Sequence, residues 1–378
     1  MAEWIECKIS DIGTVVGGAT PSTKKPENYE NGTIAWITPK DLSTFTGRYI
    51  QRGERNITEI GLKSCSTQLL PKDTVLFSSR APIGYVAIAA NEVCTNQGFK
   101  SVVPNENTDP LFLYYLLKYN KDKIEGMGSG TTFKEVSGNT MKNIVVSVPT
   151  DKKVQKRISS MLGSIDDKIE ENERINNNLE QQADALYQTF FSPKSGTQGK
   201  VVTLDEYCSI FTGKKNANAS VNGGKYKFFT CAPEALQIDS YIFDGNAIIV
   251  SGNGAYTGRT RFYSGKFDLY QRTYACTLLD NVNPDFIFPL YWFVKLELSK
   301  KIMGGTRGSA IPYIVMNDLA KFEIIYNEEM FANYTQLFKS LTEAIQANEF
   351  ESENLAQIRD SLLPKLMSGE LNVSTIEL

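Results

Sequence analysis

The chain has 378 residues, of which 41% are hydrophobic and 22% charged, and it contains no histidine. The composition is typical of a folded globular protein, and the length leaves room for two or three domains. Without histidine, the chain has no Ser-His-Asp or Cys-His catalytic arrangement and no His-containing metal site, which disfavours an enzyme.

The sequence gives no indication of a membrane span or of secretion. No apolar run approaches the roughly 18 residues of a membrane span, and the acidic start lacks an apolar stretch, so we expect neither a membrane anchor nor a secretory signal. The six cysteines are far apart and form no C-x-x-C pair. This spacing favours a reducing cytoplasm over a disulfide framework or a zinc site.

The first segment, residues 1–150, is mildly basic and is expected to form a globular α+β domain. Strand-like runs at 74–77, 85–88 and 144–147 and a short helical run at 111–118 support this expectation. An acidic segment, residues 151–191, follows. Apolar residues, with one asparagine among them, recur in it every seven positions. The recurring positions are Ile158, Ile165, Asn172, Leu179 and Leu186. A seven-residue period of this length predicts a coiled-coil helix.

Residues 198–327 form a second mildly basic segment with the same character, including strand-like runs at 247–250 and 322–325 and a helical run at 288–298. The last segment, residues 328–371, is acidic and again shows the seven-residue period. Its recurring positions are Tyr334, Leu341, Asn348, Leu355 and Leu362. The chain therefore alternates globular domain, long helix, globular domain and long helix.

The two halves are copies of one another. Residues 164–190 align with residues 340–366 at a constant offset of 176, so that Asn172 meets the identical Asn348. A helix that leaves the first domain and a helix that returns from the second would pair antiparallel. We expect Asn172 and Asn348 to lie near the pseudo-two-fold axis, because one polar position in an apolar seam fixes register. The alternative is that each helix packs only on its own domain.

Catalytic motifs are present only in imperfect form. Asn283-Pro284-Asp285-Phe286 departs from the N-P-P-[FY] methyl-transfer motif, and we interpret it as a helix start. The glycines at 252, 254 and 258 miss the dinucleotide-binding spacing by one residue, and residues 304–309 lack the lysine of a phosphate-binding loop. These segments are interpreted as loops without a catalytic role.

The polar and basic loops are better candidates for function, because Arg, Lys, Asn and Gln read base edges while Lys, Ser and Thr hold phosphates. Any single polar loop is an unspecific signal, since most such loops are only solvated. The candidates in the first half are Lys40, Ser79, Arg80, Gln97, Lys100, Thr132 and Lys134. Those in the second half are Lys214, Lys215, Asn253, Tyr256, Arg259, Arg261, Gln271, Arg272 and Arg307.

The order of segments resembles the specificity (S) subunit of type I restriction-modification enzymes. The residues that carry the resemblance are Gly128–Phe133 through Pro149, Gln155–Ile158, Leu186–Phe191 and Leu363–Leu371. The resemblance implies an α+β fold, with two pseudo-symmetric target-recognition domains separated by a long antiparallel two-helix coiled coil. In this reading residues 1–150 and 198–327 are the target-recognition domains, and 151–191 and 328–371 are the spacer helices.

The family resemblance also implies a non-catalytic, DNA-binding subunit. Each domain would read one half of a bipartite double-stranded target, and the helices would set the spacing and dock two methyltransferase (M) subunits. Restriction (R) subunits would join through them, and S-adenosylmethionine, ATP and Mg would belong to these partners. Two alternatives stay open: a stand-alone DNA methyltransferase or nuclease, and a coiled-coil adaptor that binds protein only.

Overall fold

The computed structural model describes residues 3–130, 134–192, 195–196, 198–304 and 313–373. The chain divides into two compact units, the first of which is built from two separate stretches. Unit 1 comprises residues 1–171 and 352–378, and unit 2 comprises residues 172–351. Each unit therefore contains one globular α+β part and one part of each long helix.

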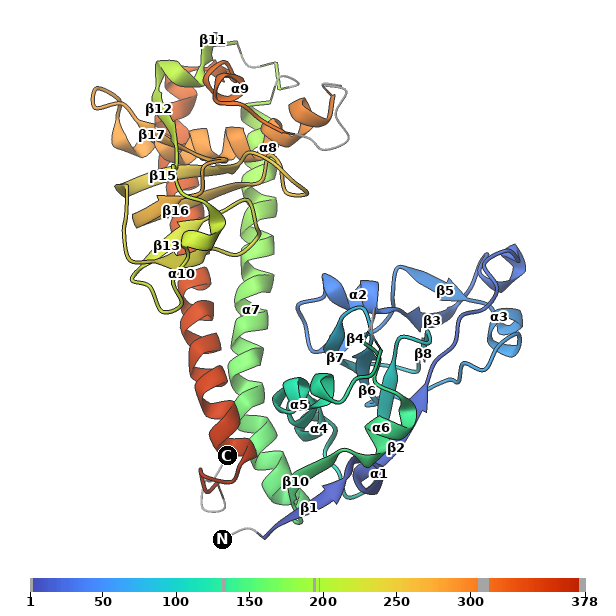
Figure 1. Ribbon diagram of the computed structural model, residues 1–378. Helices are drawn as coiled ribbons and strands as arrows, with labels where there is room; N and C mark the ends of the chain where they lie inside the picture. The colour runs from blue at the N-terminus through green and yellow to red at the C-terminus, as the bar shows by residue number, and fades with distance from the viewer. Residues whose placement is uncertain (1–2, 131–133, 193–194, 197, 305–312, 374–378) are drawn as a thin grey trace. The chain divides into compact units, whose positions relative to one another are not determined.

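Unit 1 begins with a chain of short elements. They are β1 (Trp4–Lys8), α1 (Ile9–Ile12), β2 (Gly13–Gly17), β3 (Ile34–Ile37), α2 (Pro39–Ser43), β4 (Tyr49–Ile50), β5 (Arg55–Ile57), α3 (Glu59–Lys63), β6 (Val75–Ser79), β7 (Ile83–Ala89), β8 (Cys94–Thr95) and β9 (Lys100–Pro104). They continue as α4 (Pro110–Tyr119), α5 (Lys121–Gly126), α6 (Gly138–Asn143), β10 (Val145–Pro149) and α7 (Lys152–Phe190), the last of which ends in unit 2 (Figure 1).

Unit 2 has a comparable series of elements. They are β11 (Lys200–Thr203), β12 (Cys208–Thr212), β13 (Tyr226–Phe229), β14 (Leu236–Ile238), β15 (Phe243–Ser251), β16 (Thr260–Leu269), β17 (Thr273–Leu278), α8 (Ile287–Gly304), α9 (Met316–Ala320), β18 (Glu323–Tyr326) and α10 (Glu328–Met367), which ends in unit 1. Short 3-10 turns cover Pro26–Asn28, Leu204–Glu206, Ala217–Ala219 and Pro284–Phe286. The second long helix thus ends at Met367 rather than at 371.

The main sheets of the two units share the order of their first four strands. The five-stranded sheet of unit 1 has the order β2-β9-β6-β7-β4, and the six-stranded sheet of unit 2 has the order β12-β17-β15-β16-β13-β14. A two-stranded antiparallel ribbon accompanies each sheet, β1 with β10 and β11 with β18. Unit 1 also has a three-stranded sheet, β5-β3-β8. The correspondence of β2, β9, β6 and β7 with β12, β17, β15 and β16 agrees with the repeat found in the sequence.

Each central strand is buried on both faces. In β6, Val75 and Phe77 pack in the core that contains α4, whereas Leu76 packs in a second core on the opposite face. In β15, Ile248 and Ile249 divide in the same way between the core that contains α8 and a second core. Successive side chains of a strand point to opposite faces, so a continuous apolar run is what a strand buried on both faces requires.

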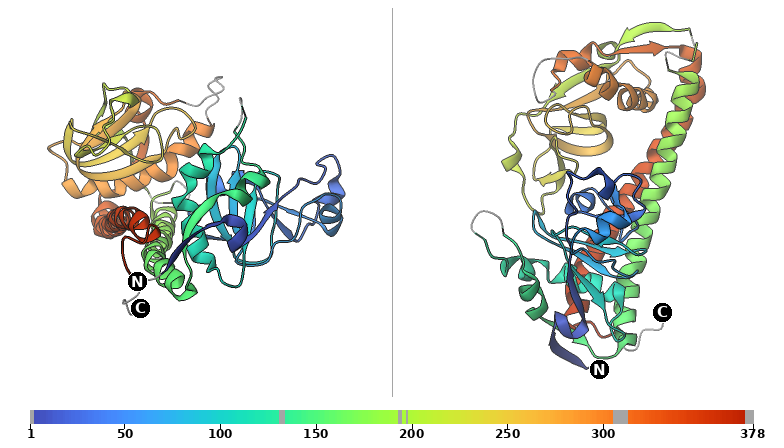
Figure 2. Two further views of the ribbon diagram at one scale, coloured as in Figure 1. Left: turned by 60° about the horizontal axis from the view of Figure 1, so that its bottom comes forward. Right: turned by 90° about the vertical axis from the view of Figure 1, so that its right-hand side faces the viewer.

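The long helices run antiparallel in each unit. In unit 2, Phe191, which directly follows α7, packs against Phe331 of α10 with ring centroids 6.0 Å apart, while Asn176 of α7 donates to the carbonyl of Ile345. In unit 1, Asp166 accepts a hydrogen bond from Arg359 at 2.7 Å. The partner residue in α10 rises in number as the residue in α7 falls. Within each unit the two helices lie side by side in every view (Figure 2).

One helix joins each sheet to the helix pair. In unit 1, the Tyr115 hydroxyl of α4 donates to Asp166 of α7 at 2.5 Å. In unit 2, the Trp292 indole of α8 donates to Thr342 of α10 at 3.0 Å, and α8 crosses both long helices (Figure 1). The two contacts occupy corresponding positions in the repeat. In each unit, an aromatic side chain of the connecting helix therefore donates a hydrogen bond to a long helix.

Asn172 is fully buried in the seam of unit 2. Its amide donates to Glu351 at 2.8 Å and to the carbonyl of Asn348 at 3.4 Å. Asn348 in turn donates to Asn176 at 2.7 Å. The two matched asparagines therefore meet, and their role in fixing register stays a prediction. No helix within the described ranges is both long and apolar enough to cross a membrane.

Candidate nucleic-acid interface

The candidate residues of unit 1 gather where the central strand β6 ends. The Ser79 amide donates to the carbonyl of Gly98 at 2.7 Å, and the Ser79 carbonyl accepts from the amide of Val136 at 3.0 Å. These two bonds join the end of β6 to the loops before β9 and before α6, and we call this meeting point the loop junction. Arg80, Gln97 and Glu135 are the neighbours of the bonded residues, so the junction brings them together.

The same junction recurs in unit 2. The Gly252 amide donates to the carbonyl of Arg272 at 2.9 Å, and the Gly252 carbonyl accepts from the amide of Ile314 at 2.8 Å. Gly252 directly follows β15, and its counterpart Ser79 is the last residue of β6. Arg272 precedes β17 as Gly98 precedes β9. The residues beside the junction are Asn253, Gln271 and Tyr313. Each unit therefore presents three loop segments in one arrangement, with different side chains on them.

In unit 1 the junction carries a charged cluster. Lys100 lies 3.4 Å from the Glu135 carboxylate, and Arg80 lies 3.7 Å from it. Lys100 is largely covered, with 15% of its side chain exposed, whereas Arg80 and Glu135 are 37% and 41% exposed. One carboxylate thus holds two cations together at the surface. Both cations are therefore held in position before a phosphate binds.

Other candidates in unit 1 differ in their exposure. Ser79 is fully buried and its hydroxyl donates to the carbonyl of Gly98 at 3.1 Å, which favours a structural role. Lys40 is exposed and pairs with Glu54 at 2.8 Å. Lys134 is exposed beside the cluster. Thr132 lies outside the described residues.

In unit 2, three arginines lie around the junction. Arg259 is exposed and its guanidinium lies 5.8 Å from the Tyr256 ring centroid. Arg261 lies over the Phe229 ring at 5.5 Å and donates to the carbonyl of Ala232. Burial, followed by the nearby charge of Arg259, lowers the pKa of Arg261 to about 10. A cation destabilised in this way gains from the approach of an anion.

Arg272 and Lys214 are exposed, and Lys215 is half-buried. The ammonium of Lys215 binds Asp268 at 2.6 Å, and Asp268 is almost completely buried. Removing Lys215 would leave a buried carboxylate without this partner, so its contacts favour a structural role. Asn253 is bridged to Tyr313 by backbone pairing. Arg307 lies outside the described residues.

The end of β16 lies close to the end of β12. Lys215 is bridged to Tyr270, and a side chain at Gly213 would overlap the carbonyl of Leu269. This close approach requires glycine at 213. It places the loop after β12 beside Gln271, whose amide donates to Asn216 at 2.9 Å.

Sequence reasoning missed the residues that organise these loops. Glu135 was missed although it follows the candidate Lys134. The residues next to it in the sequence give no sign that Arg80 and Lys100 lie near its carboxylate. Asp268 was missed as well, although it is the one carboxylate of β16 and lies between Phe267 and Leu269, where a carboxylate needs a buried partner. Within the described residues, no three Cys, Asp or Glu side chains come together as a metal site.

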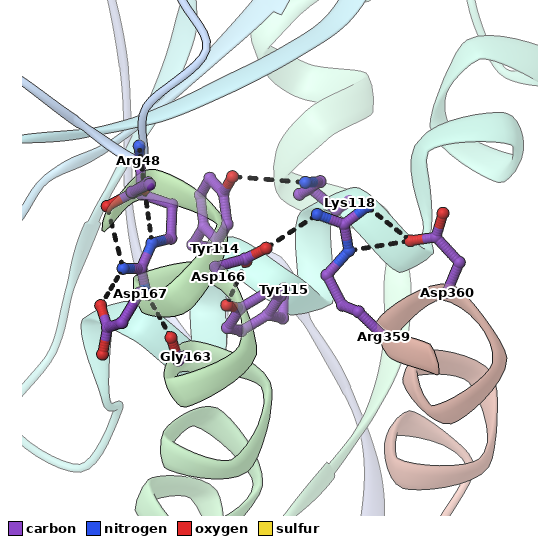
Figure 3. A network of polar contacts seen from close by, with 10 residues as sticks. Arg48, Tyr114, Tyr115, Lys118, Gly163, Asp166, Asp167, Arg359 and Asp360 are labelled. Carbon is purple, nitrogen blue, oxygen red and sulfur yellow. Dashed lines mark hydrogen bonds and ion pairs between the residues drawn. The ribbon is translucent and has the colours of Figure 1, made fainter. Parts of the chain in front are cut away.

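Arg48 is a further missed residue, and it joins a loop of unit 1 to α7. Its side chain is 5% exposed and donates to Glu170 at 2.9 Å and to the carbonyl of Gly163 at 3.2 Å, and it pairs with Asp167. Burial would lower the pKa of Arg48, but the hydrogen bonds to Glu170 and Asp167 outweigh it and raise this pKa. Figure 3 shows this network beside the Tyr115, Asp166 and Arg359 cluster.

Comparisons with known proteins identify the family of both halves of the chain. The family model of the type I restriction modification DNA specificity domain matches residues 1–181 and 198–353, one match for each half of the repeat. The chain belongs to this type I specificity family. Its α+β fold, internal repeat and paired helices are those of the family.

Relatives in this specificity family include the type I restriction enzyme MjaIX specificity subunit of Methanocaldococcus jannaschii, which is 32% identical over 99% of this chain and 95% of its own length. The EcoDI specificity subunit of Escherichia coli is 34% identical over 46% of this chain and 38% of its own length. The crystal structure of the type I S subunit from M. genitalium shares the fold, with a TM-score of 0.64 and 16% identity, covering 97% of this chain and 96% of that one.

Proposed function

We propose that this chain is the DNA sequence-recognition subunit of a type I restriction-modification enzyme and has no catalytic site of its own. The observation that carries the proposal is the repeated loop junction, which presents Arg, Lys, Gln and Asn side chains at corresponding places in the two units. Two such clusters suit a bipartite double-stranded target, with each unit reading one part. Membership of the specificity family supports this assignment.

The side chains divide into two chemical roles. Lysines and arginines at the rim, such as Lys134, Lys214 and Arg272, are suited to hold phosphates and to fix the register of the protein on the duplex. Gln97, Gln271 and Asn253 have side-chain amides that can pair with base edges in the major groove. The exposed guanidinium of Arg259 can likewise pair with the two acceptors of a guanine. The backbone bonds of the junction anchor these loops on the sheet, so less conformational entropy is lost on binding.

The long helices would act as a spacer and as a docking platform. A helix of 39 residues such as α7 is about 58 Å long. In this proposal the helices set the distance between the two recognised half-sites and bind two methyltransferase subunits, through which restriction subunits join. These partners would supply S-adenosylmethionine, ATP and Mg. A cytoplasmic location goes with the proposal, because the DNA target and these partners are there.

The test is selection of duplexes with a randomised centre by the chain assembled with its methyltransferase subunits. The proposal predicts enrichment of one split sequence, and methylation mapping of host DNA should return the same sequence. If no duplex is preferred, the chain is an adaptor without sequence-specific DNA binding. The pure chain should also transfer no methyl group from labelled S-adenosylmethionine to DNA, and incorporation above background would favour a stand-alone methyltransferase.

A further inference from the structure

Gln97 and Gln271 occupy the same position in the two units. Gln97 precedes Gly98, the residue whose carbonyl accepts the junction bond, and Gln271 precedes Arg272, which does the same in unit 2. The residue before each glutamine donates its backbone amide to the end of another strand. Asn96 donates its amide to the end of β3 at 3.0 Å, and Tyr270 donates its amide to the end of β13 at 2.9 Å.

Each glutamine side chain is held by a residue of the loop that follows the first strand of its sheet. The Gln97 amide oxygen accepts from the hydroxyl of Thr20, which lies just after β2. The Gln271 amide nitrogen donates to Asn216 at 2.9 Å, and Asn216 lies just after β12, the counterpart of β2. A glutamine amide has two donor hydrogens and two acceptor sites, so one tether leaves both donor and acceptor capacity. Each side chain is thus oriented in advance of binding.

Both glutamines are exposed and lie beside cations. The Lys100 ammonium is 3.5 Å from the carbonyl of Gln97, and Arg272 follows Gln271 directly. An amide beside phosphate-holding cations can reach a base edge. The neighbouring junction position differs between the units, with Arg80 in one and Asn253 in the other, so the two clusters share the glutamine but not the rest.

On the basis of the proposed function, we infer that Gln97 and Gln271 are matched specificity residues, each of which reads an adenine in its own half-site. The amide nitrogen donates to adenine N7 and the amide oxygen accepts from the adenine N6 amino group. Adenine is the purine that presents an acceptor and a donor side by side in the major groove, whereas guanine presents two acceptors. Each half-site therefore contains one adenine that is read in this way, and the two half-sites differ at other positions.

The experiment compares duplexes selected by the full chain, assembled with its methyltransferase subunits, and by its Gln97→Ala and Gln271→Ala variants. Each variant should lose preference for adenine at one base pair of one half-site, by about 5- to 150-fold, with the other positions unchanged. Thr20→Val removes the tether of Gln97 and should weaken the preference at that same base pair by a smaller factor. Gln182→Ala, on the exposed surface of α7, is the matched control and should leave every position unchanged.

Three other outcomes are decisive. If both glutamine variants bind all duplexes more weakly and the selected sequence is unchanged, the glutamines hold the backbone or the loop, and the inference is wrong. Loss of preference for a base other than adenine overturns it too. If the parent chain selects no sequence, the proposed function is wrong, and so is this inference, which rests on it. Equal melting temperatures of the variants and the parent chain exclude misfolding as the cause.

Discussion

Arg48 shows how a single buried cation fixes a loop to a helix. Its guanidinium binds Glu170, Asp167 and the carbonyl of Gly163, all on α7. Because Asp167 is 71% exposed, it regains water when the arginine is removed, whereas the carbonyl of Gly163 loses its charged donor. Hydrogen bonds to charged groups contribute about 1.5–3 kcal/mol each.

We therefore expect Arg48→Met to lower the free energy of unfolding by about 2–3 kcal/mol in urea denaturation. Arg52→Met, at an exposed position four residues away, should change it by less than about 0.5 kcal/mol. Equal effects of the two substitutions would show that the network contributes nothing specific.

Glu135 controls the charge of the first cluster. Its carboxylate lies within 4 Å of both Lys100 and Arg80 and offsets their attraction for phosphate. Glu135→Gln should therefore raise the affinity for random-sequence duplex and make the dependence of binding on salt steeper, by about one unit of slope for each additional phosphate that the protein neutralises. Fluorescence anisotropy over a range of salt concentrations measures both. Weaker binding at every salt concentration would mean that Glu135 orders the loop rather than shields it.

At the level of elements, the seam of the paired helices contains a polar position. Asn172 is fully buried and bonds to Glu351 and Asn348, so an apolar residue there would remove a desolvated amide. A buried asparagine in such a seam fixes register at a cost in stability. We expect the double change Asn172→Leu and Asn348→Leu to raise the urea midpoint and to broaden the set of disulfides formed by cysteine pairs placed across the seam. A lower midpoint with one unchanged pairing would contradict this expectation.

Local periodicity predicted the elements well. The seven-residue repeat indicated a helix over 151–191, and α7 spans Lys152–Phe190; the runs at 74–77 and 247–250 lie in or next to β6 and β15. These features depend on residues close in sequence. Strand order and the convergence of loops depend on contacts far apart in the chain, and they could not be predicted. Lys215 is an example, because its partner Asp268 is 53 residues away.

For the whole molecule, the repeat predicts that each unit recognises its own part of the target. Each unit has its own sheet, its own cores and its own loop junction, so a change in one cluster should affect one part of the target. Arg259 tests this because it is exposed in the cluster of unit 2, and Lys214 is its control because it is exposed and suited to a phosphate.

The most direct measurement is the binding of Arg259→Ala to duplexes that are mutated in one half-site at a time. We expect a loss of about 1–3 kcal/mol concentrated at one base pair of one half-site, while Lys214→Ala weakens binding to all sequences alike. If Arg259→Ala changes the preference in both half-sites equally, the two units do not read separate parts of the target.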